Sequence, residues 1–202
     1  MHYETAGNAH GLPHDPFKAI VSPRPVGWIT AMSGKGEINL SPYSFFNAVS
    51  ERPPMVMFSS AGRKDALTFI EETKEFVCNL AAFDLREQVN ATSKVLPRGE
   101  SELDHAGLTA APSRLVRPPR VAEAPAALEC RWLQTVPLVP LGGGEPSYFM
   151  VIGQVVGVYI DDRYIVDGLV DTAAMHPIAR AGYRDYFVAT PETKFSMTRP
   201  GG

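Results

Sequence analysis

The sequence contains no hydrophobic run long enough to span a membrane, and its first residues have neither the positive region nor the apolar core of a signal peptide. It also lacks an excess of basic residues, because its net charge is −3 at pH 7. Proteins that bind nucleic acid usually carry a basic surface that contacts phosphates. We therefore expect a cytoplasmic protein that binds neither membranes nor nucleic acid.

Cysteine is scarce in this chain. The two cysteines, Cys78 and Cys130, each lie within an apolar segment. The sequence has no Cys-x-x-Cys pair and no Cys/His cluster with the spacing of metal ligands, which argues against zinc and iron–sulfur sites. We therefore predict no metal site and two buried, unreactive thiols.

The motifs of several large enzyme classes are missing. The sequence has no Gly-x-Ser-x-Gly elbow, no His-Glu-x-x-His pair and no Gly-x-x-x-x-Gly-Lys-Ser/Thr loop. These absences argue against serine hydrolases of the elbow type, zinc proteases and P-loop nucleotidases. Gly-x-Gly-x-x-Gly is also absent, so a nicotinamide nucleotide would bind without a Rossmann unit.

The composition is that of a globular protein rich in turns. Hydrophobic residues make up 45% of the 202 residues and charged residues 20%, which is enough to bury a sizeable core. The 18 prolines and 17 glycines predict many turns and short elements. We expect residues 1–202 to form a single domain.

Hydrophobic patterning predicts short strands as the main element. The predicted strands are residues 17–21, 26–32, a strand through Ile38 and Leu40, and residues 55–60, 76–80, 127–136 and 148–160. Helices are predicted from an N-cap at Asp65 to about Lys74, and from a capping box at Asp84 to about Ser93. Because strands and helices do not alternate regularly, we predict a mainly β fold with helical insertions (α+β), a closed or partly closed antiparallel barrel.

Glycines and prolines refine this prediction. Gly153 and Gly157 indicate bulges or tight curvature in the last long strand. Residues 142–144 are three glycines and predict a flexible loop, whereas residues 95–125 are polar and dotted with prolines. We expect residues 95–125 to run over the surface.

Two segments indicate a bound flavin nucleotide. The segment Asn39-Leu-Ser-Pro-Tyr-Ser-Phe-Phe-Asn47 mixes small hydroxyl and amide groups with aromatic rings, which suits a flat ring with polar edges. Arg63 and Lys64 stand at the start of a predicted helix, where free N–H groups and the helix dipole attract anions. A phosphate is the expected anion, although two solvated surface cations are the alternative.

The ring edge has four candidate partners in the first segment, which are Ser41, Tyr43, Ser44 and Asn47. Strand alternation places Ser41 and Tyr43 on the face opposite Ser44, so the backbone must supply part of the contact. Asn47 also suits a turn. The neighbouring Phe45 and Phe46 are interpreted as core residues.

The chain resembles the flavin reductase-like family in six motifs that occur in the right order. These motifs are Pro23-Arg-Pro-Val-Gly-Trp-Ile-Thr30, Asn39–Asn47, Pro53-Pro-Met-Val-Met-Phe-Ser59, Lys64-Asp65, Glu75-Phe-Val-Cys-Asn-Leu80 and Pro177-Ile-Ala-Arg-Ala-Gly-Tyr-Arg-Asp-Tyr186. The resemblance covers residues 16–188, which we take as the core of the domain. It implies an antiparallel, Greek-key-like split barrel that binds FMN rather than FAD, and a homodimer with the flavin near the subunit interface.

The resemblance also implies an activity. It predicts an oxidoreductase in which NADH or NADPH reduces FMN, which passes electrons to an acceptor or a partner monooxygenase. The smaller reductases of this family carry a Gly-Asp-His motif near the nicotinamide, and this sequence has no such tripeptide. An FMN-binding electron carrier without its own nicotinamide turnover therefore stays open as the alternative.

Further site residues follow from the resemblance. Thr30, Ser59 and Ser60 lie at strand ends and are candidates for the ribityl or phosphate end of FMN, although such hydroxyls also satisfy loop backbone. Arg24 lies between two prolines that fix its direction, and a structural ion pair explains it equally well.

The C-terminal motif supplies the last candidates. Arg180, Gly182 and Tyr183 are predicted to line the flavin, because glycine permits close backbone approach. His176 is the single candidate for a catalytic role, as a contact to the flavin or to the nicotinamide carboxamide. A structural or exposed histidine is the alternative.

Overall fold

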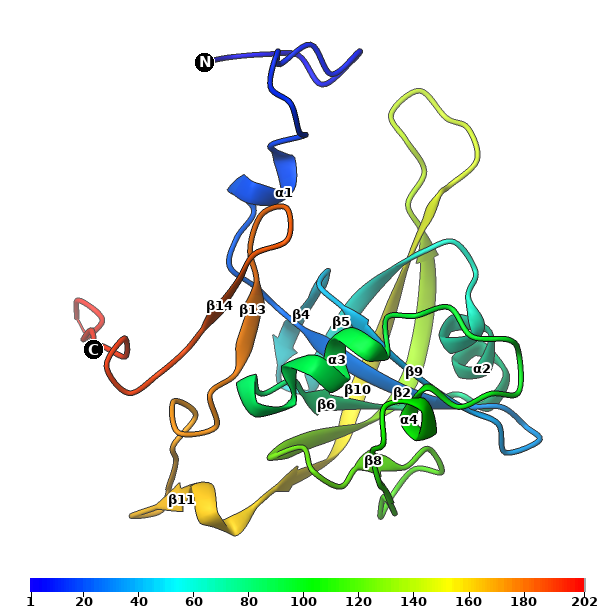
Figure 1. Ribbon diagram of the computed structural model, residues 1–202, viewed down its shortest axis with the longest axis vertical. Coiled ribbons are helices and arrows are strands. Elements are labelled where there is room, and N and C mark those ends of the chain that lie inside the picture. Colours follow the sequence, from blue (N-terminus) through cyan, green and yellow to red (C-terminus); the bar gives the residue numbers. More distant parts are fainter. Residues whose placement is uncertain (202) are drawn as a thin grey trace.

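The computed structural model describes residues 1–201, and its central feature is one curled antiparallel sheet (Figure 1). Seven strands hydrogen-bond in the order β3-β2-β6-β9-β10-β5-β4. Their bounds are β2 Gly27–Met32, β3 Ile38–Tyr43, β4 Phe46–Glu51, β5 Pro54–Ala61, β6 Glu75–Leu80, β9 Ala126–Pro137 and β10 Tyr148–Ile160. Every pairing in this sheet is antiparallel.

The sheet forms a barrel that is split along one seam. Its two edge strands, β3 and β4, follow each other in the chain and are linked by Ser44 and Phe45. In the described chain these two strands form opposite ends of the hydrogen-bonded order, so the barrel does not close between them. The predicted mainly β class and partly closed antiparallel barrel are confirmed.

The barrel interior is filled by large apolar side chains. Phe58 on β5 and Phe76 on β6 are fully buried, with ring centroids 5.9 Å apart in an edge-on arrangement. Cys78 and Cys130 are buried in the same cluster and form no disulfide, which confirms their prediction as core thiols. Burial raises the pKa of the Cys78 thiol, so its reactive thiolate is disfavoured.

Two bulges bend the longest strand. The β9–β10 register shifts between Ile152 and Gly153 and again between Val155 and Gly157, as the two glycines predicted. A Cβ atom on Gly153 would lie 2.4 Å from the Phe76 ring, so only glycine lets β10 pass this close to the core. The curvature of the barrel wall therefore depends on this residue.

The helices differ from their predicted starts. Helix α2 spans Asp65–Thr73 and ends at Lys74 in a left-handed cap, but its N-cap is Lys64, so the prediction of Asp65 as N-cap was wrong. The predicted second helix is a 3₁₀ turn, η1 (Phe83–Leu85), followed by α3 (Arg86–Ala91), and neither has a side-chain cap. The predicted capping box at Asp84 was wrong, because the N-cap residues of the two pieces are Ala82 and Leu85.

Two predicted segments also differ. Residues 17–21 do not form a strand, because Phe17–Ile20 make one helical turn, α1. Residues 95–125 are not only a surface segment. They contain α4 (Glu102–His105), β7 (Ala110–Ala111) and β8 (Arg120–Val121), and they bury Leu103 and Val121 in a second core cluster. Spaced apolar residues within a polar segment explain this burial.

A small sheet stands beside the barrel. It pairs β1 (Arg24–Pro25) with β13 (Ile178–Arg180) and β13 with β14 (Tyr186–Val188), and the turn of this β13–β14 hairpin lies next to α1 in Figure 1. The remaining elements are η2 (Asp162–Tyr164), β11 (Ile165–Val166) and β12 (Leu169–Val170). Among residues 1–201, no helix is long and apolar enough to cross a membrane. No group of three or more His, Cys, Asp or Glu residues suits a metal ion within that same range.

Candidate functional site

A groove of about 1030 Å³ opens next to the seam of the barrel. One wall is the α1 region and β1, another is the link between β3 and β4, and the third comes from β5 and the start of β10. Four of the predicted site residues line it, namely Arg24, Ser44, Asn47 and Ser59. The sequence segments 23–30, 39–47 and 53–59 therefore meet at one place.

Strand geometry decides which of these polar groups face the groove. Ser59 and Ser60 are neighbours on β5, so they point to opposite faces. Ser59 lines the groove, whereas Ser60 is fully buried and donates to the carbonyl of Gly62 at 2.9 Å. The Asn47 Oδ1 atom accepts from the N–H of Ala48 at 2.8 Å, so its NH₂ group is the part that can donate to a ligand.

Arg24 lines the groove but is held by the backbone. Its side chain donates to the carbonyls of Lys18 at 2.6 Å, of Ala181 at 3.2 Å and of Val21. Burial lowers the pKa of Arg24, and the nearby charge of Arg180 adds to this effect. The Arg24 Nε atom is buried without a hydrogen-bond partner in the described chain.

Arg63 and Lys64 stand just beyond the groove, in the connection from β5 to α2. The Arg63 guanidinium pairs with Glu71 at 2.5 Å and lies 4.9 Å from the centroid of the Phe149 ring. The backbone N–H of Gly62 donates to the carbonyl of Ser147, a residue that lines the groove. The predicted cationic helix start is therefore joined to the groove wall, and both cations are exposed.

Three other candidates lie inside the barrel wall. Thr30 is fully buried and accepts from Asn79 at 2.8 Å, and the Ser41 hydroxyl lies 3.3 Å from Asn39 Oδ1. Tyr43 packs on Phe58 with centroids 4.6 Å apart, and burial raises its pKa to about 12. None of these three lines the groove in the described chain.

The C-terminal candidates do not line the groove in the described chain. Arg180 donates to the carbonyls of Tyr183 and Arg184, and Tyr183 lies 5.7 Å from the His14 ring. Gly182 packs against α1. His176 is half-buried with a φ of 48°, and its carbonyl accepts from Phe83.

The groove also contains residues that sequence reasoning did not select. Phe45 was interpreted as core, yet it lines the groove, 6.0 Å from the Tyr148 ring. Lys18, Ser147 and Tyr148 line it as well. Tyr148 begins the longest β-like run, and its position opposite Ala61 on β5 became visible only with the strand register.

The groove suits a flat, polar-edged ring. Aromatic rings of Phe45, Phe46 and Tyr148 provide apolar walls, while Ser44, Asn47 and Ser59 provide a few polar groups. The Arg24 Nε atom has no partner within residues 1–201 but is buried, so it is not counted among the groups that can contact a ligand. This combination of aromatic walls and polar groups fits a flavin ring.

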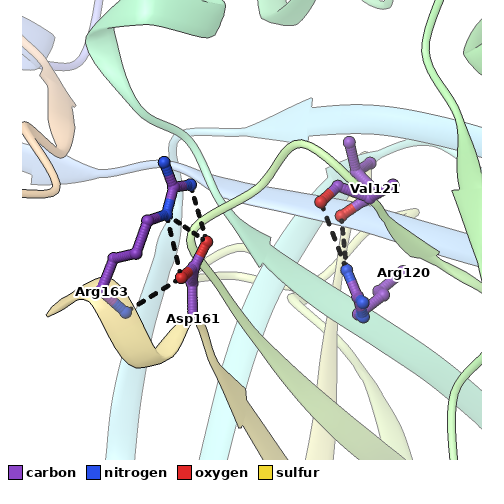
Figure 2. Close-up of polar contacts among 5 residues, drawn as sticks. Arg120, Val121, Asp161 and Arg163 are labelled. Carbon is purple, nitrogen blue, oxygen red and sulfur yellow. Dashed lines mark hydrogen bonds and ion pairs between the residues drawn. The ribbon is translucent and has the colours of Figure 1, made fainter. Parts of the chain in front are cut away.

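Other cavities fit a flavin less well. A polar pocket of about 690 Å³ at the opposite end of β10 contains Arg120 and Asp161. Figure 2 shows that these groups are already engaged, because Asp161 binds Arg163 at 2.7 Å and Arg120 reaches the carbonyls of Val121 and Ala122 at 3.4 Å. An apolar pocket between α3 and β14 is only about 280 Å³.

The chain is similar to known proteins over most of its length. The family model described as "Flavin reductase like domain" matches residues 21–173. An uncharacterized protein of Halalkalibacterium halodurans is 37% identical over 188 residues, which cover 89% of this chain and 87% of that protein.

Two solved structures share the fold over nearly the whole chain. Nitrilotriacetate monooxygenase component B from Bacillus cereus superposes with a TM-score of 0.85 and 28% identity, and the match covers 98% of both chains. The 2-nitrobenzoate 2-nitroreductase NbaA of Pseudomonas fluorescens also has a TM-score of 0.85, with 26% identity over 100% of this chain and 97% of that one.

Proposed function

The chain belongs to the flavin reductase-like family, and on this basis we propose that it binds FMN in the groove and uses it as an NAD(P)H-dependent oxidoreductase. The proposal depends mainly on one observation. Arg24, Ser44, Asn47 and Ser59 come from separate segments of the chain and line one groove whose walls are aromatic.

FMN is favoured over FAD by the position of the cations. Arg63 and Lys64 lie at the N-terminal end of α2, where a terminal phosphate monoester would meet both charges and the free N–H groups of the helix.

The remaining candidates act through the barrel wall. Thr30, Ser41, Tyr43 and Ser60 would hold the strands that carry the contacting residues, because their own polar groups are engaged with other protein groups.

When bound, FMN would supply a hydride acceptor and an electron store, so the protein need only orient and shield it. Ser44, Ser59 and the NH₂ group of Asn47 would fix the polar edge of the ring. Phe45 and Tyr148 would exclude water from its faces. No side-chain acid or base is needed for hydride transfer. Because His176 does not line the groove, we propose its contact with the nicotinamide carboxamide only for a donor that extends past the groove, as a means of orienting that donor.

Two fates of the electrons are supported by different observations. A partner monooxygenase is favoured by the likeness to nitrilotriacetate monooxygenase component B. The absence of a Gly-Asp-His tripeptide favours an electron carrier that receives electrons from another protein.

We also propose a homodimer. The groove is wide, and the apolar side chains at its rim are exposed, with Phe17 at 54%, Ile20 at 75% and Tyr148 at 38%. A second copy that covers this rim would remove apolar surface from water and enclose the flavin.

The proposal is tested by mixing FMN-loaded protein with NADH or NADPH without oxygen. Loss of the visible flavin band supports a reductase. If dithionite reduces the flavin but neither nucleotide does, the electron-carrier alternative is correct. His176→Ala should lower the apparent affinity for the nucleotide more than that for FMN, and unchanged reduction kinetics would remove His176 from the site.

A further inference from the structure

The α1 wall of the groove has very little packing of its own. Helix α1 is a single turn with no buried residue, and Phe17, Ile20 and Val21 are all exposed. A segment with few buried contacts opens at low free energy compared with the core. The contacts that do hold this wall therefore decide how often the groove is open.

Two contacts outside α1 hold it. The first is Arg24, whose guanidinium binds the carbonyls of Lys18 and Val21 on one side and of Ala181 in the turn after β13 on the other. The second is Gly182, which allows such close packing that an added Cβ would lie 2.6 Å from the Cβ of Ala19. Both contacts join the same two segments, α1 and the β13–β14 hairpin.

We propose that Arg24 is a positioning residue that closes the α1 wall over the groove, and that this closure sets how long the flavin stays bound. The inference rests on the proposed function, because it assumes that the groove holds FMN. The role differs from direct flavin binding, since the two Nη atoms of Arg24 are already used by three carbonyls. Gly182 contributes to the same closure, because it has no side chain and so lets the β13–β14 hairpin pack directly on α1.

The first test measures FMN release. Arg24→Met keeps an unbranched apolar stem and removes every donor, so it should speed FMN dissociation about tenfold. Association should also become faster, by no more than about the same factor, because the flavin-free groove opens more often as well. Arg24→Lys keeps one charged donor and should give an intermediate rate.

Gly182→Ala is the second variant, and it leaves Arg24 intact. Its new Cβ would meet α1 directly, and Gly182 has a backbone conformation that alanine tolerates, so the effect must pass through α1. Gly34→Ala, in the turn after β2, is the matched control. Its new Cβ would meet only the flexible end of the Glu72 side chain. We expect faster FMN release in Gly182→Ala and an unchanged rate in Gly34→Ala.

Limited proteolysis tests the wall without any flavin. Trypsin can cut after Lys18, within α1, but not after Arg24, because Pro25 follows it. Arg52→Met is a matched control, since Arg52 also precedes a proline and its side chain is 89% exposed. In flavin-free protein, cleavage at Lys18 should be at least about fivefold faster in Arg24→Met than in wild type or Arg52→Met at equal global stability.

The outcomes separate the two proposals. Unchanged Lys18 cleavage and unchanged FMN release in folded Arg24→Met and Gly182→Ala would overturn the role of Arg24. If the wild type binds no FMN, the proposed function fails, while proteolysis at Lys18 still tests whether Arg24 closes the wall.

Discussion

Replacement of Arg63 by alanine should weaken the binding of FMN and leave the affinity for riboflavin almost unchanged. Arg63 is paired with Glu71 at 2.5 Å, and its side chain is 54% exposed, so binding phosphate requires it to leave this partner. An exposed ion pair is worth about 0.2–1 kcal/mol, and a hydrogen bond to a charged group about 1.5–3 kcal/mol. The net contribution to FMN is therefore about 1–2 kcal/mol, or about 5- to 30-fold in Kd.

The same argument predicts the opposite effect for Glu71→Gln. This change removes the competitor of the phosphate and one negative charge, so FMN should bind about threefold more tightly. Arg86→Ala is the matched control, because Arg86 also pairs with a carboxylate, Glu87 at 3.6 Å, and also lies over an aromatic ring, with 4.3 Å to the centroid of Phe83. It lies on α3, away from the groove, and should not change FMN affinity.

The assay is quenching of flavin fluorescence, measured for FMN and riboflavin with each variant. If Arg63→Ala lowers the affinity for FMN and for riboflavin equally, Arg63 supports the fold or contacts the flavin ring rather than the phosphate. Weaker FMN binding by Glu71→Gln would refute the competition between Glu71 and phosphate.

Three further predictions concern stability and assembly. Asn79→Ala should lower the free energy of unfolding by about 3 kcal/mol in urea, because buried Asn79 binds Thr30, the Trp28 carbonyl and the Val121 N–H at 2.8–3.0 Å, and a loss below about 1 kcal/mol would contradict this. Burial raises the pKa of Glu102, so its stabilising effect is complete below the usual glutamate pKa and is lost as pH rises through the higher folded value. Wild type should therefore lose stability relative to Glu102→Gln over that rise, and parallel pH profiles of unfolding would contradict the direction of the shift. Sedimentation equilibrium of FMN-loaded protein at micromolar concentration should give a homodimer, and a monomer with flavin bound would contradict the proposed cover of the groove.

The fold was largely predictable where periodicity was strong. The strand Tyr148–Ile160 has the predicted ends, and Gly153 and Gly157 correctly indicated its irregular register. Residues 17–21 were misassigned because a single helical turn is too short for a helical period to appear. The buried part of residues 95–125 was missed because its apolar residues are separated by prolines and polar residues.

The site was predictable as a set of segments but not as a set of side chains. Ser59 and Ser60 are adjacent residues of the same type, so the sequence does not show which one faces the groove. Only the strand register shows that it is Ser59. The partners of Arg24 are backbone carbonyls, which leave no mark in the sequence. Tyr148 reaches the groove from a strand that is distant in the chain, so its role depends on the fold.

The central claim is that the groove holds the flavin, and a crystal structure of the protein with FMN tests it most directly. We predict that the ring lies between Phe45 and the α1 wall with its polar edge at Asn47 and Ser59, and that the phosphate lies near Arg63 and Lys64. Flavin bound in the pocket between α3 and β14, or in the polar pocket at Asp161, would contradict the claim.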